Sequence, residues 1–198
     1  MRILCRSTLG ALALLCVLGN TQCTSGSGST GNGAPLFVTT LQITDANGNP
    51  ATSFATSTVS SPVQINFTLT VRNRSNSAQT LYFSNSEQFN FAVINDSNGD
   101  VVWNSDAANA ATTGSGSVTI PAMGSQTFTA VTWNQANNSG NLVGSGTYEV
   151  IGGATVFNTT GLNNSQDTSG DVMPTGIPTP GELYPSIYRS TLTQFTIQ

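Results

Sequence analysis

The sequence predicts an all-β protein that folds as an antiparallel sandwich of two sheets, with about eight or nine strands. Apolar and polar residues alternate from Leu36 to the C-terminus, and no part of that stretch shows the period of an amphipathic helix. Asn, Thr, Ser and Gly dominate the composition, and charged residues make up only 7% of it, which favours strands and turns over helices. The close spacing of the turns is typical of a sandwich rather than an open sheet.

The expected strands follow one another along the chain and are separated by turns rich in Gly, Asn and Ser. Asp45–Pro50 is such a turn, because its Asn47-Gly48 pair supplies the positive φ angle that a tight turn requires. Val63–Arg72 alternates most cleanly, which predicts one buried and one wet face. The full set of expected strands is Leu36–Ile43, Val63–Arg72, Gln79–Phe83, Gln88–Ile94, Val101–Ser105, Val118–Ile120, Gln126–Trp133, Thr147–Phe157 and Thr191–Ile197.

Residues 1–22 are expected to be a signal peptide. Arg2 and Arg6 precede the apolar run Leu9–Gly19, which gives the basic start and short apolar segment of a secretory signal. This run is too short for a transmembrane helix, which needs about 20 apolar residues. The chain is therefore expected to be exported.

Cys23 follows this run and begins a Ser- and Gly-rich stretch, residues 23–35, which predicts a flexible tether. A cysteine in this place resembles the acylated first residue of a mature bacterial lipoprotein, so Cys23 is a candidate lipidation site. Gln22 and Asn20 depart from the small and aliphatic residues that lipoprotein signals place there, so ordinary cleavage near Thr21–Thr24 is the alternative. The expected product is a lipoprotein of the outer or cytoplasmic membrane or a secreted protein, with a lipid anchor as its one membrane contact.

Residues 36–198 are expected to form a single domain. Within it, residues 158–186 hold four prolines and four glycines and are too long and irregular for an ordinary connection. This segment is predicted to be a long insertion before the last strand and a candidate contact surface.

The charge balance excludes some classes of partner. Without the signal peptide, three arginines remain against nine acids, a net charge of about −6, and the sequence contains no lysine or histidine. An anionic surface without a basic patch argues against nucleic acid and against anionic membrane surfaces as partners.

The residue content also argues against catalysis, and no cofactor is expected. The usual general bases and nucleophiles are missing, since the mature chain holds no histidine, no lysine and, besides Cys23, no cysteine. Paired carboxylates remain, and Asp100 with Asp106 or Asp167 with Asp171 could be nominated. Each pair sits in or beside a turn, where acids usually cap the backbone, so the chain is predicted not to be an enzyme.

A calcium site is a second chemical hypothesis. Asp96, Asn98 and Asp100 have the spacing of the first three ligands of an EF-hand loop. The pattern then fails, because Val101 stands where that loop needs glycine and Ala107 where it needs a bidentate glutamate. Two other acidic turns fail in the same way, Asp45–Pro50 and Asp167–Val172. These segments are predicted to be turns rather than metal sites.

Four aromatic residues could line a sugar-binding platform, namely Tyr82, Trp103, Trp133 and Tyr148. Tryptophans within alternating strands of a sandwich are more often part of the core, and that interpretation is preferred here.

An ordered set of features between Val63 and Val150 carries a family resemblance. They are Val71, Asn73 and Ser75; Ser84 or Ser86 leading into Gln88, Phe89, Phe91 and Val93; Asp96 and Gly99; Val102, Trp103 and Ser105; Gly124; Trp133; and Gly146, Tyr148, Glu149 and Val150. With the closing run Gln194–Ile197, this order resembles the intracellular proteinase inhibitor domain family, BsuPI.

The resemblance implies an immunoglobulin-like sandwich and, as in founding members of the family, inhibition of a cytosolic subtilisin-type serine protease. The predicted export and residues 158–186 depart from that pattern, and the resemblance supplies no inhibitory residue. The leading hypothesis is therefore a non-enzymatic envelope protein that acts as a proteinase inhibitor or protease-binding module, with a serine protease or another envelope protein as its expected partner. The alternative is a structural or adhesive sandwich that binds cell-wall glycan or an envelope protein.

Overall fold

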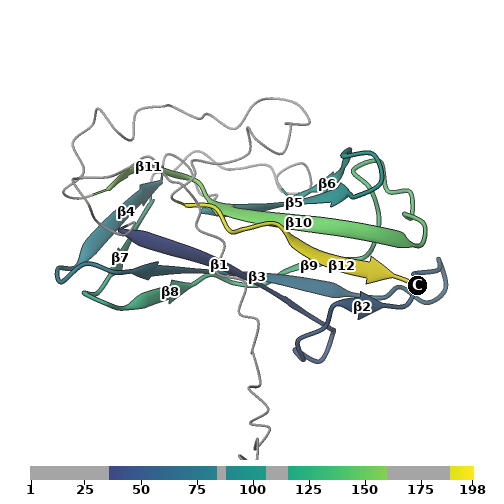
Figure 1. Ribbon diagram of the computed structural model, residues 1–198, viewed down its shortest axis with the longest axis horizontal. Helices are drawn as coiled ribbons and strands as arrows, with labels where there is room; N and C mark the ends of the chain where they lie inside the picture. The colour runs from purple at the N-terminus through teal and green to yellow at the C-terminus, as the bar shows by residue number, and fades with distance from the viewer. Residues whose placement is uncertain (1–35, 84–87, 106–115, 160–187) are drawn as a thin grey trace, which may run out of the picture.

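The computed structural model describes residues 36–83, 88–105, 116–159 and 188–198. The predicted signal peptide, the tether, Cys23 and nearly all of the predicted insertion at 158–186 lie outside these ranges. The strands, shown in Figure 1, are β1 (Phe37–Thr44), β2 (Ser53–Phe54), β3 (Ile65–Asn73), β4 (Gln79–Phe83), β5 (Phe89–Asn95), β6 (Val101–Asn104), β7 (Gly116–Ile120), β8 (Ser125–Thr127), β9 (Val131–Trp133), β10 (Gly146–Ala154), β11 (Val156–Thr159) and β12 (Thr193–Ile197). In the described ranges, no helix is long and apolar enough to cross a membrane.

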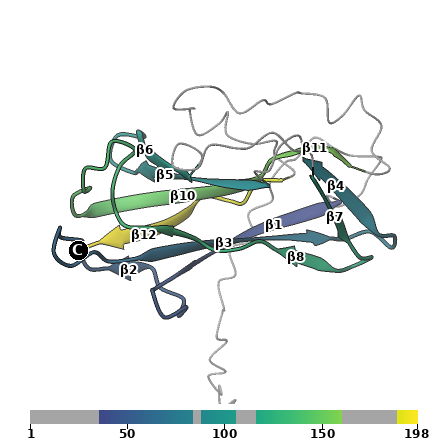
Figure 2. The same ribbon diagram turned by 180° about the vertical axis from the view of Figure 1, so that it is seen from behind.

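Two sheets face each other, and a third, smaller sheet lies at one end (Figures 1 and 2). One sheet of the sandwich consists of β1, β3, β8 and β9. β1 pairs along its whole length with one side of β3, and β8 and β9 pair in succession with the other side of β3. The other is the five-stranded sheet β2-β12-β10-β5-β6, and the small sheet is β11-β4-β7. All pairings are antiparallel except that of the short β2 with β12. The predicted all-β antiparallel sandwich is confirmed.

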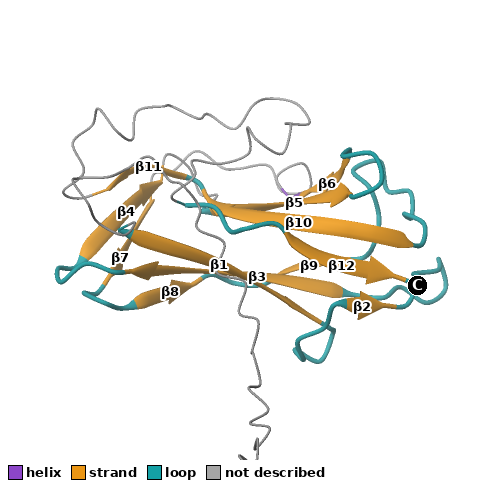
Figure 3. Cartoon of the chain, viewed as in Figure 1, coloured by secondary structure: helices purple, strands orange, loops and turns teal. Residues whose placement is uncertain are grey.

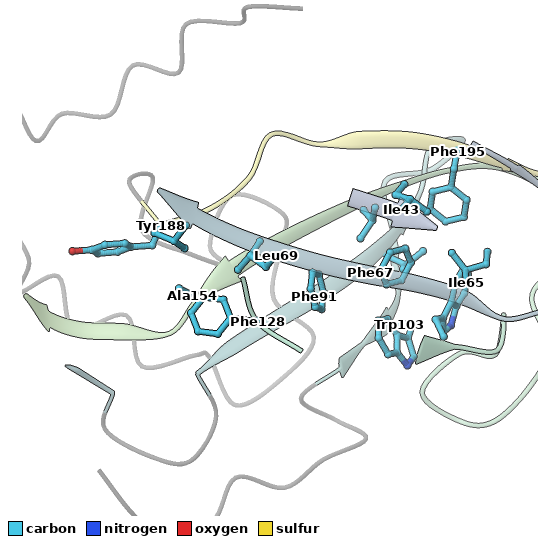
Figure 4. Packing of buried hydrophobic residues seen from close by; sticks show 14 of the residues in the cluster. Ile43, Ile65, Phe67, Leu69, Phe91, Trp103, Phe128, Ala154, Tyr188 and Phe195 are labelled. Carbon is cyan, nitrogen blue, oxygen red and sulfur yellow. The ribbon is translucent and has the colours of Figure 1, made fainter. Parts of the chain in front are cut away.

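The predicted alternation in β3 is confirmed, and it supplies the centre of the core. Ile65, Phe67, Leu69 and Val71 are fully buried, while the residues between them are half-buried or exposed. The ring of Phe67 packs against four other aromatic rings, and Figure 4 shows this region of the core. These rings are Phe91, Trp103, Trp133 and Phe195.

The described residues form twelve strands rather than the eight or nine expected, and two of the extra strands arise because two predicted strands, Gln126–Trp133 and Thr147–Phe157, are each divided in two. Between β8 and β9, three residues (128–130) oppose only two residues of β3 (68–69), which is a β-bulge. After β10, the chain leaves the five-stranded sheet at Thr155 and continues as β11 beside β4. Strands that change sheets in this way form the corners of a sandwich.

The third extra strand is β2, which spans two residues and has no periodic signal in the sequence. It runs parallel to the end of β12 and places Phe54 in the core, where the ring meets Phe195 edge-on. Its position matters for the site, because the loop that follows it begins at the edge of the five-stranded sheet.

Candidate functional site

Four connections lie at the end of the sandwich where β3 and β10 begin, toward the right of Figure 3. They are residues 45–52 between β1 and β2, residues 55–64 between β2 and β3, residues 96–100 between β5 and β6, and residues 134–145 between β9 and β10. We call this the long-loop end. At the opposite end, the structure describes the turns 74–78 and 121–124. Loops held on a rigid scaffold commonly form the binding surfaces of sandwich domains.

The β2–β3 loop is fastened at its base by Gln135, which belongs to the β9–β10 loop. The Gln135 side chain is fully buried, its Oε1 accepts the Ser57 backbone N–H at 2.8 Å, and its Nε2 donates to the Ala55 carbonyl at 2.9 Å. Ser57 is also buried, and its hydroxyl accepts the Val63 N–H at 2.8 Å, which joins the two arms of the loop. One amide side chain therefore holds two loops together.

The tip of the β2–β3 loop is a closed two-residue turn. Thr58 and Ser61 each donate a backbone N–H to the carbonyl of the other, both at 3.1 Å, and the Thr58 hydroxyl accepts a further bond from the Ser61 N–H. Val59 lies at the turn with 96% of its surface exposed. The turn therefore presents an apolar side chain on a backbone that is held in shape by the hydrogen bonds between Thr58 and Ser61.

The β9–β10 loop is ordered by Asn and Gln side chains. Gln135 has a φ of 58°, a left-handed conformation that is costly for a residue other than glycine. Its carbonyl accepts the Val143 N–H at 2.8 Å, and beside this bond lies Leu142, which is 40% exposed. Asn138 crosses to the edge strand β6, where its Oδ1 accepts the Asn104 N–H at 3.0 Å.

The segment Asp96–Asp100 is a turn, as predicted. Gly99 has a φ of 76°, and its N–H donates to the Asn95 carbonyl at 2.8 Å. The Asn98 side chain donates to Asp100 at 2.6 Å and accepts the Asp100 N–H at 3.1 Å. The oxygen atoms of Asn95, Asn98 and Asp100 named here thus accept hydrogen bonds from within the turn itself.

The turn Asp45–Pro50 is built in the same way. The Asp45 carboxylate accepts the backbone N–H groups of Asn49 at 2.8 Å and Asn47 at 2.9 Å. The hydrogen bonds from Asn49, followed by those from Asn47, lower the pKa of Asp45. Gly48, with a φ of 82°, provides the bend that the sequence predicts. In the described part of the chain, no three His, Cys, Asp or Glu side chains gather as a metal site would require.

The predicted carboxylate pairs cannot be compared with the structure as pairs. Asp100 lies in the β5–β6 turn, whereas Asp106, Asp167 and Asp171 lie outside the described residues. Among the described residues, Asp45, Asp96 and Asp100 lie in turns at the long-loop end, whereas Arg72 and Arg74 lie at the opposite end of β3.

The opposite end is closed by Asn73, which is fully buried at the end of β3. Its Nδ2 donates to the carbonyls of Ser77 at 2.8 Å, Pro121 at 3.0 Å and Ile120 at 3.2 Å, and its Oδ1 accepts the Ser75 N–H at 2.9 Å. Thus the two short turns of this end share one buried amide.

Met123 is the exposed apolar residue of this end. Its φ is 57°, and 55% of its surface is exposed. Its N–H donates to the Ser75 carbonyl at 3.0 Å, which fixes the β7–β8 turn against the β3–β4 turn.

The preferred interpretation of the aromatic residues is confirmed for three of the four. Trp103, Trp133 and Tyr148 are buried, and Tyr82 is half-buried. The Tyr148 hydroxyl donates to the Gly144 carbonyl at 2.8 Å, four residues upstream, which is the tyrosine corner of immunoglobulin-like sandwiches. Burial raises the pKa of Tyr148. These aromatic side chains form the framework beneath the loops rather than a flat binding platform.

Sequence reasoning missed both Val59 and Gln135. A single valine in a run of serine and threonine carries no periodic signal, and the partners of Gln135 lie 78 and 80 residues away in sequence. The available signal was the length of the two connections, since long ordered loops often carry function.

Comparison with known families places the chain. The model of the intracellular proteinase inhibitor family, BsuPI, matches residues 52–158, just over half of the 198 residues. The matched region runs from the residue before β2 into β11 and includes both long loops.

Comparisons with individual proteins add little. No curated protein matches the chain. A β-glucosidase involved in saponin metabolism from intestinal bacteria is similar over 83% of this chain and 16% of its own, with 12% identity and a TM-score of 0.34. The CARDB domain of the PF1109 protein from Pyrococcus furiosus, solved in complex with di-metal ions, is similar over 83% of this chain and 96% of its own, with 7% identity and a TM-score of 0.33. TM-scores of 0.34 and 0.33 are too low for either structure to indicate the function of this chain.

Proposed function

This chain belongs to the intracellular proteinase inhibitor family, BsuPI, and on that premise we propose that it is a non-enzymatic protein that binds and inhibits a serine protease. The observation that carries the proposal is the family match over residues 52–158, which includes strands β2 to β10 and the loops between them. Family membership implies a protease as partner in general. The serine class follows from the founding members of the family.

Inhibition would be steric. A rigid loop that fills the active-site cleft of a protease excludes substrate without any chemistry of its own, and preordered loops bind at a lower entropic cost. The hydrogen-bonded loops of this sandwich suit such a role, because Gln135 and Asn73 each fix two connections at once. The scarcity of catalytic groups in the sequence agrees with a protein that acts through its surface.

An inhibition assay tests this proposal. Residues 23–198, the predicted mature chain, are titrated against subtilisin and a panel of bacterial envelope serine proteases with a peptide substrate. We expect inhibition of at least one enzyme at micromolar concentration or below. Absence of inhibition and of binding across the panel would overturn the functional proposal, while the fold would stand.

We further propose that the protein acts in the cell envelope, attached through an acyl group on Cys23. The supporting features are the basic and apolar start of the sequence, the cysteine after it and the polar stretch that follows. Cells grown with radiolabelled palmitate should label the wild-type protein and not a Cys23→Ser variant. Label on both proteins, or on neither, would contradict attachment at Cys23.

A further inference from the structure

We propose that the β2–β3 loop is the inhibitory contact, and that its tip enters the active-site cleft of a serine protease as an apolar wedge. Val59 fills an apolar subsite, and Leu142 of the β9–β10 loop packs against the rim of the cleft. This inference rests on the proposed function and adds the face, the residues and the mode of contact.

The first argument is exposure. The large apolar side chains that stand out from the described surface are Val59, Met123, Leu142 and Leu192. Val59 is the most exposed of them, at 96%, and so has the most apolar surface to bury in a partner. Val59 and Leu142 lie on the two loops that Gln135 joins, so both exposed apolar side chains are carried by one connected pair of loops.

The second argument is rigidity. Gln135 keeps a left-handed backbone while it makes hydrogen bonds to Ala55, Ser57 and Val143. Strain of this kind persists only where surrounding contacts determine the conformation, and it is found preferentially at functional sites. The junction of the two loops is therefore fixed before a partner arrives, which lowers the entropy lost on binding.

The third argument concerns the shape of the tip. A segment that a protease binds in its cleft as an added strand must be extended. The Val59–Ser60 pair instead lies within a turn closed by two backbone hydrogen bonds between Thr58 and Ser61. The tip can therefore occupy the cleft with a side chain but cannot align its peptide bond for attack, and the inhibitor should remain uncleaved.

Among the residues described at the opposite end, the turns 74–78 and 121–124 show no comparable projection, although Met123 is exposed there. Asn73 joins these two turns, and the Met123 N–H donates to the Ser75 carbonyl across them. Met123 is thus a matched control for Val59, with a comparable chemical character at the other end of the same sandwich.

Three charge substitutions test the inference on the mature chain, residues 23–198. Against the protease of the panel that the wild type inhibits best, Val59→Asp should raise the inhibition constant by about a hundredfold or more, because it places an unpaired charge in an apolar subsite. Leu142→Asp should raise it by about tenfold, since a rim residue contributes less. Met123→Asp should leave it unchanged. All three side chains are exposed, so equal melting temperatures verify that the variants are folded.

Two further measurements define the mode of contact. A peptide aldehyde that occupies the substrate cleft should compete with the wild-type protein for binding to the protease. Mass spectrometry after prolonged incubation should recover the chain uncut between Val59 and Ser60. Lack of competition, cleavage at that bond, an unchanged constant for Val59→Asp, or equal weakening by Met123→Asp would each overturn this inference. If the wild type inhibits and binds no protease in the panel, the proposed function fails first and this inference falls with it.

Discussion

Replacing Asn73 with alanine should destabilise the whole domain, because this one side chain joins the two turns 74–78 and 121–124, both of which connect the sheet of β3 and β8 with the small sheet of β4 and β7. The two N–H groups of Asn73 are shared among three carbonyls, and its oxygen accepts both the N–H and the hydroxyl of Ser75. Counting about four hydrogen bonds at roughly 1 kcal/mol each, some of which water can replace, gives a loss of about 3 kcal/mol. For a domain of this size that loss lowers the melting temperature by about 10 °C.

Urea denaturation followed by tryptophan fluorescence measures this loss, since Trp103 and Trp133 lie in the core. Asn76→Ala, at an exposed position of the same turn, is the matched control and should change stability by less than about 0.5 kcal/mol. Asn73→Asp keeps the acceptors but turns a negative charge towards three carbonyls, so it should cost more than alanine at neutral pH. A loss below about 1 kcal/mol for Asn73→Ala would refute the reasoning, because it would mean that water replaces the amide freely.

Three further predictions address packing and pH. Gly152→Ala should lower the melting temperature by several degrees, since the added Cβ would lie 2.7 Å from ring carbons of Phe91 and overpacking costs about 1–3 kcal/mol; an unchanged melting temperature would contradict it. Tyr148→Phe should cost about 1 kcal/mol at neutral pH by removing the bond to Gly144. Because burial raises the pKa of Tyr148, the wild type alone should lose this tyrosine's contribution as pH rises through the raised value, so urea midpoints of the two proteins should converge above about pH 10. The lowered pKa of Asp45 means that its contribution is present above about pH 4 and lost as pH falls through the folded-state value, and Asp45→Asn should remove this acid dependence of the urea midpoint.

Much of the sheet structure could be predicted from the sequence, because alternation reports directly which side of a strand is buried. The buried face of β3 and the turn at Gly99 follow from local pattern and turn chemistry alone. The divisions of the predicted strands could not be found in this way. The bulge at 128–130 and the change of sheet at Thr155 depend on which strand lies alongside.

The candidate site was less accessible to sequence reasoning than the fold. Val59 is a candidate contact residue because it is exposed at the tip of a closed turn, whereas the sequence shows only a valine between polar residues. Gln135 is a structural residue of the site because it bonds to the backbone of another loop, and its neighbours in the sequence give no sign that this glutamine is buried. Contacts between distant segments decide both cases, and a single sequence carries no record of them.

The Asn- and Ser-rich composition, which predicts turns, also explains how this protein can order its loops. Residues 36–198 contain no cysteine, and only Asp45, Asp96, Asp100, Glu149, Arg72, Arg74 and Arg189 carry charged side chains in the described ranges. Disulfides and ion-pair networks therefore contribute little to loop order there, and buried neutral side chains such as Asn73, Ser57 and Gln135 bind the backbone instead. Neutral hydrogen bonds do not titrate and are weakly screened by salt. The shape of the Val59 turn should accordingly persist across changes of pH and ionic strength, which is the property that a preordered wedge requires.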